Sequence, residues 1–345
     1  PALHAALADH ACVIPVYIDD PEAEAPWAPG GASRWWLHHS LAALDISLRA
    51  RGSALLIRRG SSLAVLRALI RETGATAVYW TRLYEPALVA RDTATKAALR
   101  EDGVDAHSSK GALWREPWEV KTGGGEPYRV FTPFWRALQT QLPPLRVLPA
   151  PEHIPAPRQR PAGVPLSALG LLPKRDWADA FSADWQPGED GALAALSAFA
   201  DGGVRGYHGN RDLPAVAGTS RLSPHLHFGE ISPEQIRAAM TRAAGSAALA
   251  SDAGHLLREV GWREFAHHLL YAFPQTPEQP LYAKFAAVRW RAPADYADDL
   301  AAWQRGQTGI PIVDAGMRQL WTTGWMHNRV RMIVASLLTK NLLIP

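Results

Sequence analysis

The sequence predicts an α/β domain with a doubly wound parallel sheet, followed by a domain made entirely of α-helices. Three features lead to this prediction. Short apolar runs alternate with helix-type segments over the first 115 residues, and residues 116–185 are rich in proline and glycine. From residue 186 onwards the pattern is helical to the end. We therefore expect domains at residues 1–115 and 186–345, joined by a linker at residues 116–185.

The first domain contains short apolar runs that have the length and composition of buried strands. They lie at residues 11–18, 54–57, 77–80 and 104–106. A helix end is expected at residues 1–9, and further helices at 30–49, 62–71 and 87–101. Such alternation gives right-handed crossovers and a parallel sheet, and ligands bind beyond the carboxyl ends of its strands. The loop at residues 81–86 lies at such an end, but no Gly-x-Gly-x-x-Gly dinucleotide motif occurs.

The linker reads as a long irregular connector, because prolines recur between residues 143 and 165. Within it, the aromatic segment at residues 128–135 is expected to pack against a domain. The helices predicted after residue 185 lie at 191–200, 224–228, 233–243, 253–273, 294–304, 312–321 and 327–343. Gly306 and Gly324 follow two of these helices, at positions typical of C-caps.

Composition places the chain among ordinary globular proteins. It has 345 residues, 47% hydrophobic and 20% charged, which is enough for about two domains. Fourteen tryptophans are many, and they indicate stacking surfaces, a chromophore pocket or electron relays in addition to core packing. The net charge is +3, and the basic excess lies after residue 200 and is almost all arginine. This excess permits nucleic-acid binding without requiring it.

Cys12 is the single cysteine, so an internal disulfide is excluded and a reducing cytoplasm fits. No apolar run approaches the length of a membrane span, and no signal-peptide pattern is present. We expect a cytoplasmic protein without a membrane partner.

Residues 219–230 read Thr-Ser-Arg-Leu-Ser-Pro-His-Leu-His-Phe-Gly-Glu. Ser223 before Pro224 is typical of an N-cap followed by the first helical residue. Hydroxyl groups and the guanidinium of Arg221 beside a helix N-terminus can hold an anion, such as a phosphate or diphosphate. An ordinary pair of helix caps is the alternative. Ser232 and Gln235 have capping-box spacing, which predicts a second helix start.

Glu259, Trp262 and Arg263 share one helix face, at positions i, i+3 and i+4. They form either a cavity wall with a flat ring and a carboxylate, or a surface ion pair beside a half-buried tryptophan. Near the last helix, the amide of Asn328 and the arginines of 329–331 suit a phosphate or a polar heterocycle.

Other site classes receive no support. No His, Cys and Asp cluster has the spacing of metal ligands, so no metal is expected. The Gly-x-Ser-x-Gly motif of serine hydrolases is also missing.

Taken together, these segments resemble the DNA photolyase/cryptochrome family of flavoproteins. Residues 219–233 are similar to its flavin-binding signature, 262–265 to its substrate-cavity helix, and 306–320 and 323–332 to its second signature. The resemblance covers nearly the whole chain. It is strongest to class I cyclobutane pyrimidine dimer photolyases, and the family pattern extends beyond both ends of this sequence. We therefore expect a truncated chain with an incomplete flavin pocket.

The resemblance implies that the helical domain holds FAD in a folded-back conformation. The implied flavin contacts are Tyr207, Thr219, Ser220, Arg221, Leu222, Ser223, Asn328 and Arg331. It leaves room for a second, antenna chromophore, either a folate or a deazaflavin. Glu85 resembles an antenna-site acid, whereas Glu278 stands where folate-binding members tend to place a lysine.

The implied activity is that of a deoxyribodipyrimidine photo-lyase, a carbon–carbon lyase. Excited reduced FAD passes an electron to a pyrimidine dimer that has been flipped out of damaged DNA. The implied catalytic residues are Glu259, Trp262, Asn328 and Met332 in the substrate cavity, and Trp290 as the outermost member of an electron relay. The implied DNA contacts are Arg211, Trp262, Arg263 and Arg329. Without the resemblance, Trp290 reads as an ordinary packed side chain.

Two other functions stay open at this point. One is a cryptochrome-type blue-light receptor that signals without repairing DNA. The other is a light-independent flavoprotein reductase or nucleotide-binding module, which the missing dinucleotide motif disfavours. We expect a monomer in each case.

Overall fold

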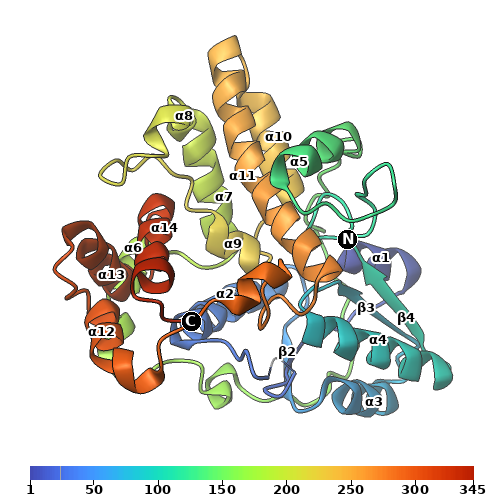
Figure 1. Ribbon diagram of the computed structural model, residues 1–345. Helices are drawn as coiled ribbons and strands as arrows, with labels where there is room; N and C mark the ends of the chain where they lie inside the picture. Colours follow the sequence, from blue (N-terminus) through green and yellow to red (C-terminus); the bar gives the residue numbers. More distant parts are fainter. Residues whose placement is uncertain (24) are drawn as a thin grey trace.

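The computed structural model describes residues 1–23 and 25–345, as an α/β part and a helical part (Figure 1). In the α/β part, β1 (Val16–Asp19) pairs in parallel with β2 (Leu56–Arg59), and Val16 lies opposite Leu56. β3 (Ala77–Thr81) pairs in parallel with β4 (Asp105–Ser109). The predicted parallel α/β organisation, followed by helices, is confirmed.

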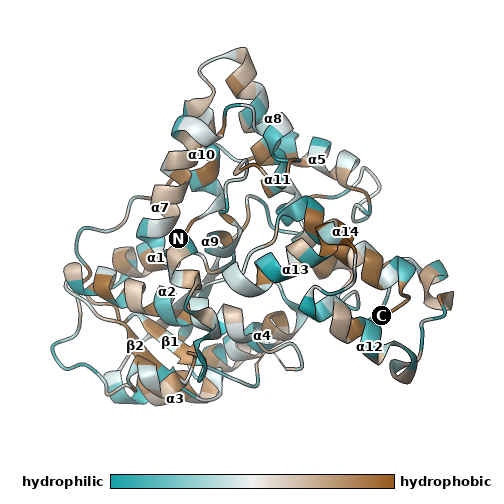
Figure 2. Cartoon of the chain, turned by 90° about the vertical axis from the view of Figure 1, so that its left-hand side faces the viewer, coloured by the Kyte–Doolittle hydropathy of each residue, from teal (hydrophilic) through white to brown (hydrophobic). Residues whose placement is uncertain are grey.

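The strands form two separate pairs, β1–β2 and β3–β4, where the sequence predicted one sheet. Each pair is hydrogen-bonded only within itself, because among the described residues no strand bridges β1 and β3. The surrounding helices are α1 (Ala2–Asp9), α2 (Gly31–Ala50), α3 (Ser62–Thr73) and α4 (Pro86–Glu101). In Figure 2, β1, β2 and α3 each carry both hydrophobic and hydrophilic residues.

The linker carries more structure than its proline content predicts. It contains α5 (Phe131–Thr140), whose buried side chains Phe131, Phe134, Trp135 and Leu138 follow the i, i+3, i+4, i+7 pattern of one helix face. The prediction of an irregular connector is therefore wrong at α5, and the expected packing of the aromatic segment is confirmed. α5 packs against α11 (Ala247–Ala272), and both contribute to one hydrophobic core. At Gly261 a Cβ would lie 2.5 Å from the Trp135 ring, so this close approach requires glycine.

The remaining helices follow the predicted order, except that the four-residue helices α6 and α8 were not predicted. They are α6 (Phe181–Asp184), α7 (Glu189–Ala198), α8 (Tyr207–Asn210), α9 (Ser223–His227), α10 (Pro233–Ala243), α12 (Pro293–Arg305), α13 (Pro311–Thr323) and α14 (Asn328–Ser336). Short 3-10 or π turns lie at η1 (Leu166–Leu169), η2 (Asp176–Ala178), η3 (Phe199–Gly203), η4 (Ala283–Ala287) and η5 (Leu337–Asn341). Gly306 and Gly324 end α12 and α13 in the left-handed conformation, as predicted. The capping box of Ser232 and Gln235 at the start of α10 is also confirmed.

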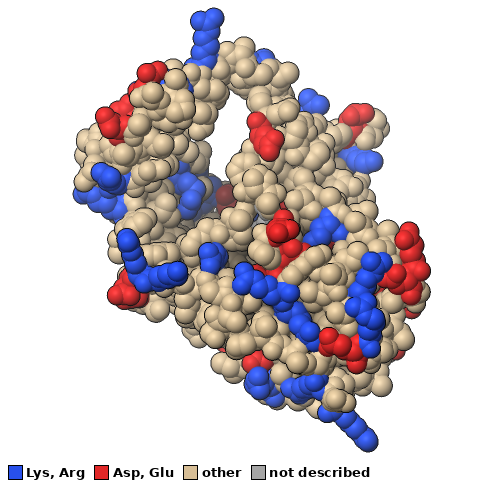
Figure 3. All heavy atoms as spheres, turned by 90° about the horizontal axis from the view of Figure 1, so that it is seen from below, with Lys and Arg blue, Asp and Glu red and all other residues tan. Residues whose placement is uncertain are grey.

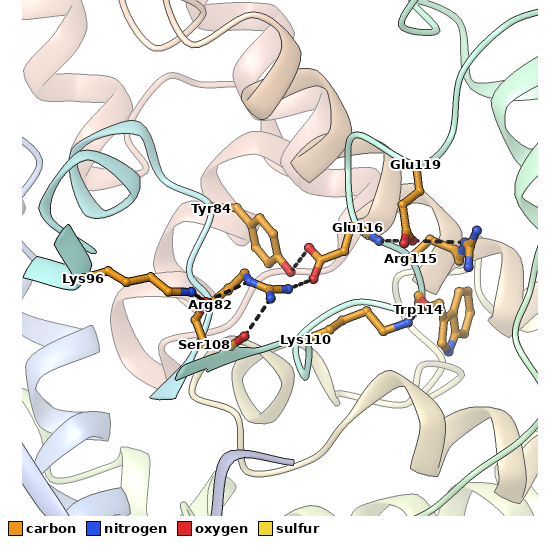
Figure 4. Close-up of polar contacts among 9 residues, drawn as sticks. All are labelled: Arg82, Tyr84, Lys96, Ser108, Lys110, Trp114, Arg115, Glu116 and Glu119. Atoms are coloured by element: carbon orange, nitrogen blue, oxygen red, sulfur yellow. Dashed lines mark hydrogen bonds and ion pairs between the residues drawn. The ribbon is translucent and has the colours of Figure 1, made fainter. Parts of the chain in front are cut away.

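A polar network joins the strand ends to the beginning of the linker (Figure 4). The hydroxyl of Tyr84 donates a hydrogen bond of 2.8 Å to the buried carboxylate of Glu116. Arg82 pairs with the same carboxylate and donates a bond of 2.6 Å to the carbonyl of Ser108 in β4. Burial, and then the hydrogen bond to Glu116, raise the pKa of Tyr84, so its phenol stays neutral. The network fixes the linker against β3 and β4.

Glu264 of α11 is buried and binds the two residues that directly precede the linker. Its two carboxylate oxygens accept backbone N–H bonds from Trp114 at 2.8 Å and Arg115 at 3.3 Å. Burial disfavours the charged form and raises the pKa of Glu264 from 4.5 to about 8. In the folded protein this carboxyl is therefore protonated at neutral pH, whereas in the unfolded chain it is ionised.

We expect this difference to make the protein less stable as the pH rises. Between pH 4.5 and pH 8 the folded state holds a proton that the unfolded state has released. The free energy of unfolding should fall by up to about 1.4 kcal/mol per pH unit in this window and level off above it. Urea unfolding at several pH values, followed by tryptophan fluorescence, measures this. The slope should be smaller in a Glu264→Gln variant, and equal slopes would contradict the assignment.

Candidate functional site

A cavity of about 470 Å³ lies among α8, α11, α14 and the loop before α9. This volume is within the usual range of sites for small molecules and cofactors. In Figure 1, α14 lies to the left of this region and α11 to its right. Seen from below, the molecule is hollowed between two lobes, and basic and acidic side chains are interspersed over this face (Figure 3).

Most of the site residues expected from the sequence line this cavity. They are Tyr207, Arg211, Thr219, Ser220, Arg221, Leu222, Ser223, Glu259, Arg263, Asn328 and Arg331. The structure thus brings together residues from chain segments more than a hundred positions apart.

The segment before α9 holds Arg221 in an unusual conformation. Its backbone φ of 52° is left-handed, which is uncommon for a residue with a side chain and carries strain. The guanidinium carbon lies 4.6 Å from the Trp325 ring centre and 5.3 Å from that of Trp185. Asp184 lies 3.7 Å from the guanidinium. Stacking between two indoles therefore holds the strained residue in place.

α9 begins one residue earlier than an N-cap at Ser223 would require, at Ser223 and not at Pro224. Leu222 already has helical backbone angles and is the N-cap, and no side chain caps the helix. The prediction that Ser223 is the N-cap is wrong, because Ser223 is the first helical residue. Its hydroxyl therefore does not cap the helix, and Ser223 lines the cavity.

The buried carboxylate of Glu230 connects α9 to α2. The Oε2 atom of Glu230 lies 2.5 Å from Nδ1 of His225 in α9, and its Oε1 accepts a 2.9 Å bond from Trp36 Nε1 in α2. Burial alone would raise the pKa of Glu230, but hydrogen bonds from His225, Ser40 and Trp36 lower it overall. The carboxylate therefore stays ionised and ties the cavity floor to the α/β part.

α11 forms one wall. Its lining residues Leu256, Glu259, Val260 and Arg263 follow the i, i+3, i+4, i+7 spacing of a single stripe. Glu259 forms an ion pair with Arg211, which balances the one carboxylate on this stripe.

Two further lining groups are held by their surroundings. Burial, and then the negative charge of Glu259, raise the pKa of Tyr207 to about 12, so its phenol is neutral. Arg263 donates hydrogen bonds to the carbonyls of Ala112, just before the linker, and Leu226 in α9, and so holds both segments to this wall.

α14 forms the opposite wall, with Asn328 and Arg331 on the cavity. Arg331 is in no ion pair with any described residue, so its guanidinium is available to an anion. His327 caps the helix by accepting the N–H of Arg329 at 3.1 Å, and burial lowers the pKa of this histidine. The guanidinium of Arg331, the amide of Asn328 and the hydroxyls of Thr219 and Ser220 are hydrogen-bond donors that suit phosphate oxygens.

Four expected residues lie outside the cavity lining. Trp262 is 45% exposed and stacks on Phe131 at a ring distance of 3.7 Å. Arg329 pairs with Asp212 at 2.7 Å, and its Nη1 lies 3.7 Å from the sulfur of the exposed Met332. Trp290 is 45% exposed and lies between η4 and α12, away from the lining.

Several lining residues were not expected from the sequence: Asp212, Leu226, Ile236, Leu256, Val260, Trp325 and Met326. Leu256 and Val260 could have been found, because they share the helical stripe of Glu259. Trp325 directly precedes the polar group of α14, and Asp212 directly follows Arg211. Their neighbours in sequence were the available signal.

Two site classes have no support in the part of the chain that the structure covers. Among the described residues, no group of three or more His, Cys, Asp or Glu side chains could hold a metal ion. The described helices include none that is long and apolar enough to cross a membrane.

Comparison with known proteins agrees with this geometry. Residues 1–157 match the sequence model of DNA photolyase, and residues 256–345 match that of the FAD binding domain of DNA photolyase. The chain is 48% identical to a deoxyribodipyrimidine photo-lyase of Agrobacterium fabrum, over 99% of this chain and 70% of that protein. It is 37% identical to Cryptochrome-2 of Arabidopsis thaliana, over 100% of this chain and 58% of that protein.

Solved structures give the same result. A class III photolyase from Agrobacterium tumefaciens superimposes with a TM-score of 0.94 at 48% identity, over 100% of this chain and 70% of that one. A Synechocystis cryptochrome superimposes with a TM-score of 0.85 at 26% identity, over 99% of this chain and 72% of that one.

The chain therefore belongs to the DNA photolyase/cryptochrome family, and its helical part carries the family's FAD-binding domain. The finer resemblance to class I stays a prediction, since the structure that matches at 48% identity is a class III enzyme. The cavity residues fit FAD, because hydroxyls and the unpaired guanidinium of Arg331 suit its diphosphate, and Trp325 and Leu256 offer apolar surface to its rings.

Proposed function

We propose that this chain binds FAD in the cavity between α11 and α14 and uses light to repair cyclobutane pyrimidine dimers in DNA. The observation that carries the proposal is the convergence of Arg221, Glu259 and Arg331 on one 470 Å³ cavity in a chain of the photolyase family. In this proposal residues 1–115 form the antenna domain, 116–185 the linker and 186–345 the FAD- and DNA-binding domain.

The flavin diphosphate binds the segment from Thr219 to Ser223 together with Arg331. These residues supply hydroxyl, backbone N–H and guanidinium donors on adjoining walls of the cavity. Tyr207, whose phenol stays neutral, and Asn328 complete the flavin contacts. Arg221 keeps its orientation because two indole rings hold it.

The flipped dimer binds at the mouth of the cavity. Trp262 has one ring face on Phe131 and is 45% exposed, so its free surface can stack on the dimer. Met332 is also exposed. In this proposal it lies beside Trp262 and adds apolar contact to the dimer. Arg211, Arg263 and Arg329 support this rim or meet the DNA phosphates, which is the sequence-independent part of the affinity.

When bound, reduced FAD would supply the electron for light-driven cleavage of the two ring bonds that join the pyrimidines. The protein's own residues position the reactants. Glu259 hydrogen-bonds the polar edge of the dimer and stabilises the charge that develops there, while Arg211 holds this carboxylate in place. Trp290 is the proposed surface member of the relay that keeps the flavin reduced.

The test is an absorption spectrum of the purified chain, followed by a light-dependent repair assay on dimer-containing DNA. A flavin spectrum with repair supports the proposal. Flavin without repair favours a cryptochrome-type receptor. The 37% identity to Cryptochrome-2 supports this alternative. A chain that takes up no flavin contradicts both functions.

We expect a Glu259→Gln variant to repair dimers with a several-fold lower quantum yield. The amide removes the negative charge that Arg211 balances and weakens the stabilisation of charge on the dimer. The yield is measured with DNA binding saturated, so that affinity does not enter. Glu152→Gln makes the same change at an exposed position outside the proposed sites and should leave the yield unchanged. An unchanged yield in Glu259→Gln would remove this residue from the mechanism.

Three finer points belong to the same proposal. A second chromophore, folate or deazaflavin, binds in the α/β part, and extraction with mass spectrometry would identify it. A photolyase from Sulfolobus tokodaii, with a TM-score of 0.77 and 26% identity, contains two FAD molecules.

The chain acts as a monomer in this proposal, which gel filtration tests. It acts in the cytoplasm, which fits its single exposed cysteine.

A further inference from the structure

A second cavity, of about 380 Å³, shares no lining residue with the first. It lies where the beginning of α2 meets the linker segment at residues 170–177. No residue proposed above for flavin, dimer or DNA belongs to it.

Three cationic side chains line this cavity: Arg34, Lys174 and Arg175. No acidic residue lines it, and none of the three takes part in an ion pair with the described residues. Many other arginines of the chain are paired, as Arg67 is with Asp102 at 2.6 Å. Like charges around one hollow repel each other, so an anion bound among them would relieve an unfavourable arrangement.

Arg34 is already oriented for such a ligand. Its Nη2 donates a bond of 2.5 Å to the carbonyl of Gly170, which ties α2 to the linker. A guanidinium has five N–H donors in a fixed plane, so the others stay available for a forked contact with phosphate oxygens.

Trp177 adds an aromatic surface to the same cavity. Its ring meets Phe181 edge-on at 5.6 Å and lies so close to α2 that a Cβ on Gly31 would be 2.9 Å from it. Glycine at this position therefore lets the indole reach the cavity wall. A flat ring next to three cations is the combination that recognises an aromatic ring carrying phosphate.

We propose that this cavity binds a small organic phosphate with a flat ring, a ligand of the nucleotide type. Its phosphates contact Arg34, Lys174 and Arg175, and its ring packs against Trp177. The cavity volume suits a single small molecule, and the bond between Arg34 and Gly170 spans from α2 to the linker. The limited volume favours a free ligand over a nucleic-acid strand, which needs a continuous track.

The experiment is isothermal titration of the purified chain with ADP, pyrophosphate and adenosine, each at low and high salt. ADP should bind more tightly than the other two, since only ADP has both the ring and the phosphates. Arg34→Ala, Lys174→Ala and Arg175→Ala should each weaken ADP binding by roughly tenfold or more. Trp177→Leu should weaken ADP but leave pyrophosphate unchanged. Thermal melts confirm that each variant is folded.

Two controls separate this cavity from the rest of the surface. Arg71→Ala removes an exposed arginine of α3 and should leave ADP binding unchanged. Saturating the chain with FAD beforehand fills the first cavity and should leave ADP binding to the second cavity unchanged. Loss of ADP binding in the FAD-saturated chain, or no effect of the three variants, would overturn the proposal. So would an oligonucleotide that binds more tightly than ADP and depends on the same three residues.

Discussion

A Glu230→Ala variant should lose about 2–6 kcal/mol of unfolding free energy, because two buried hydrogen-bonding groups lose their partner at about 1–3 kcal/mol each. The carboxylate is buried and joins the Nδ1 atom of His225 in α9 to the indole N–H of Trp36 in α2. Without it, two buried polar groups lose their partner at once. Denaturant unfolding followed by tryptophan fluorescence measures the loss.

The control for this prediction is Glu278→Ala, at an exposed glutamate, which should change stability by less than about 0.5 kcal/mol. Glu230→Gln, which keeps one acceptor, should lie between the two. If Glu230→Ala unfolds at the same denaturant concentration as the unchanged protein, the buried pair does not stabilise the fold. Because α9 carries Ser223 into the cavity, flavin affinity should fall in parallel with stability.

An Arg331→Ala variant should bind FAD about tenfold to hundredfold more weakly, the range expected when a charged hydrogen bond to a ligand is lost. Arg331 lines the first cavity and is in no ion pair with the described residues, so its removal leaves no protein partner unsatisfied. Its stability should therefore stay close to that of the unchanged protein. Titration monitored by flavin fluorescence gives the affinity.

Arg71→Ala is the matched control here too, since it removes an exposed arginine outside either cavity. It should bind FAD with unchanged affinity. Equal affinities for Arg331→Ala and Arg71→Ala would show that Arg331 makes no contact with the flavin, and the proposed position of the diphosphate would have to be abandoned.

Local signals in the sequence predicted most of the fold. The strands near Ile57 and Val78 and the helix ends at Gly306 and Gly324 follow from apolar runs and from glycine at C-cap positions. α5 was missed because the prolines around it dominated the reading, although its aromatic residues have helical spacing. The division into two strand pairs depends on which strands become neighbours in space, and no local pattern encodes that.

The sequence motifs predicted the residues that line the site. The prediction was incomplete for features that no motif encodes. Arg221, Glu259 and Arg331 meet in one cavity as the family resemblance implied. The left-handed backbone of Arg221 could not be predicted, since it depends on stacking with Trp185 from a distant helix end. Glu230 was read only as the last residue of a motif, because the Trp36 indole that it binds lies almost two hundred positions earlier.

The network of Arg82, Tyr84 and Glu116 has a consequence for light harvesting (Figure 4). It holds the ends of β3 and β4 to Glu116 at the start of the linker, and Glu264 and Arg263 hold the preceding residues 112–115 to α11. A pigment seated near those strand ends would thus keep a constant distance and dipole orientation toward the flavin. Resonance transfer of excitation depends steeply on both quantities. Loosening these contacts would therefore lower the efficiency of energy transfer to the flavin before it altered the chemistry of repair.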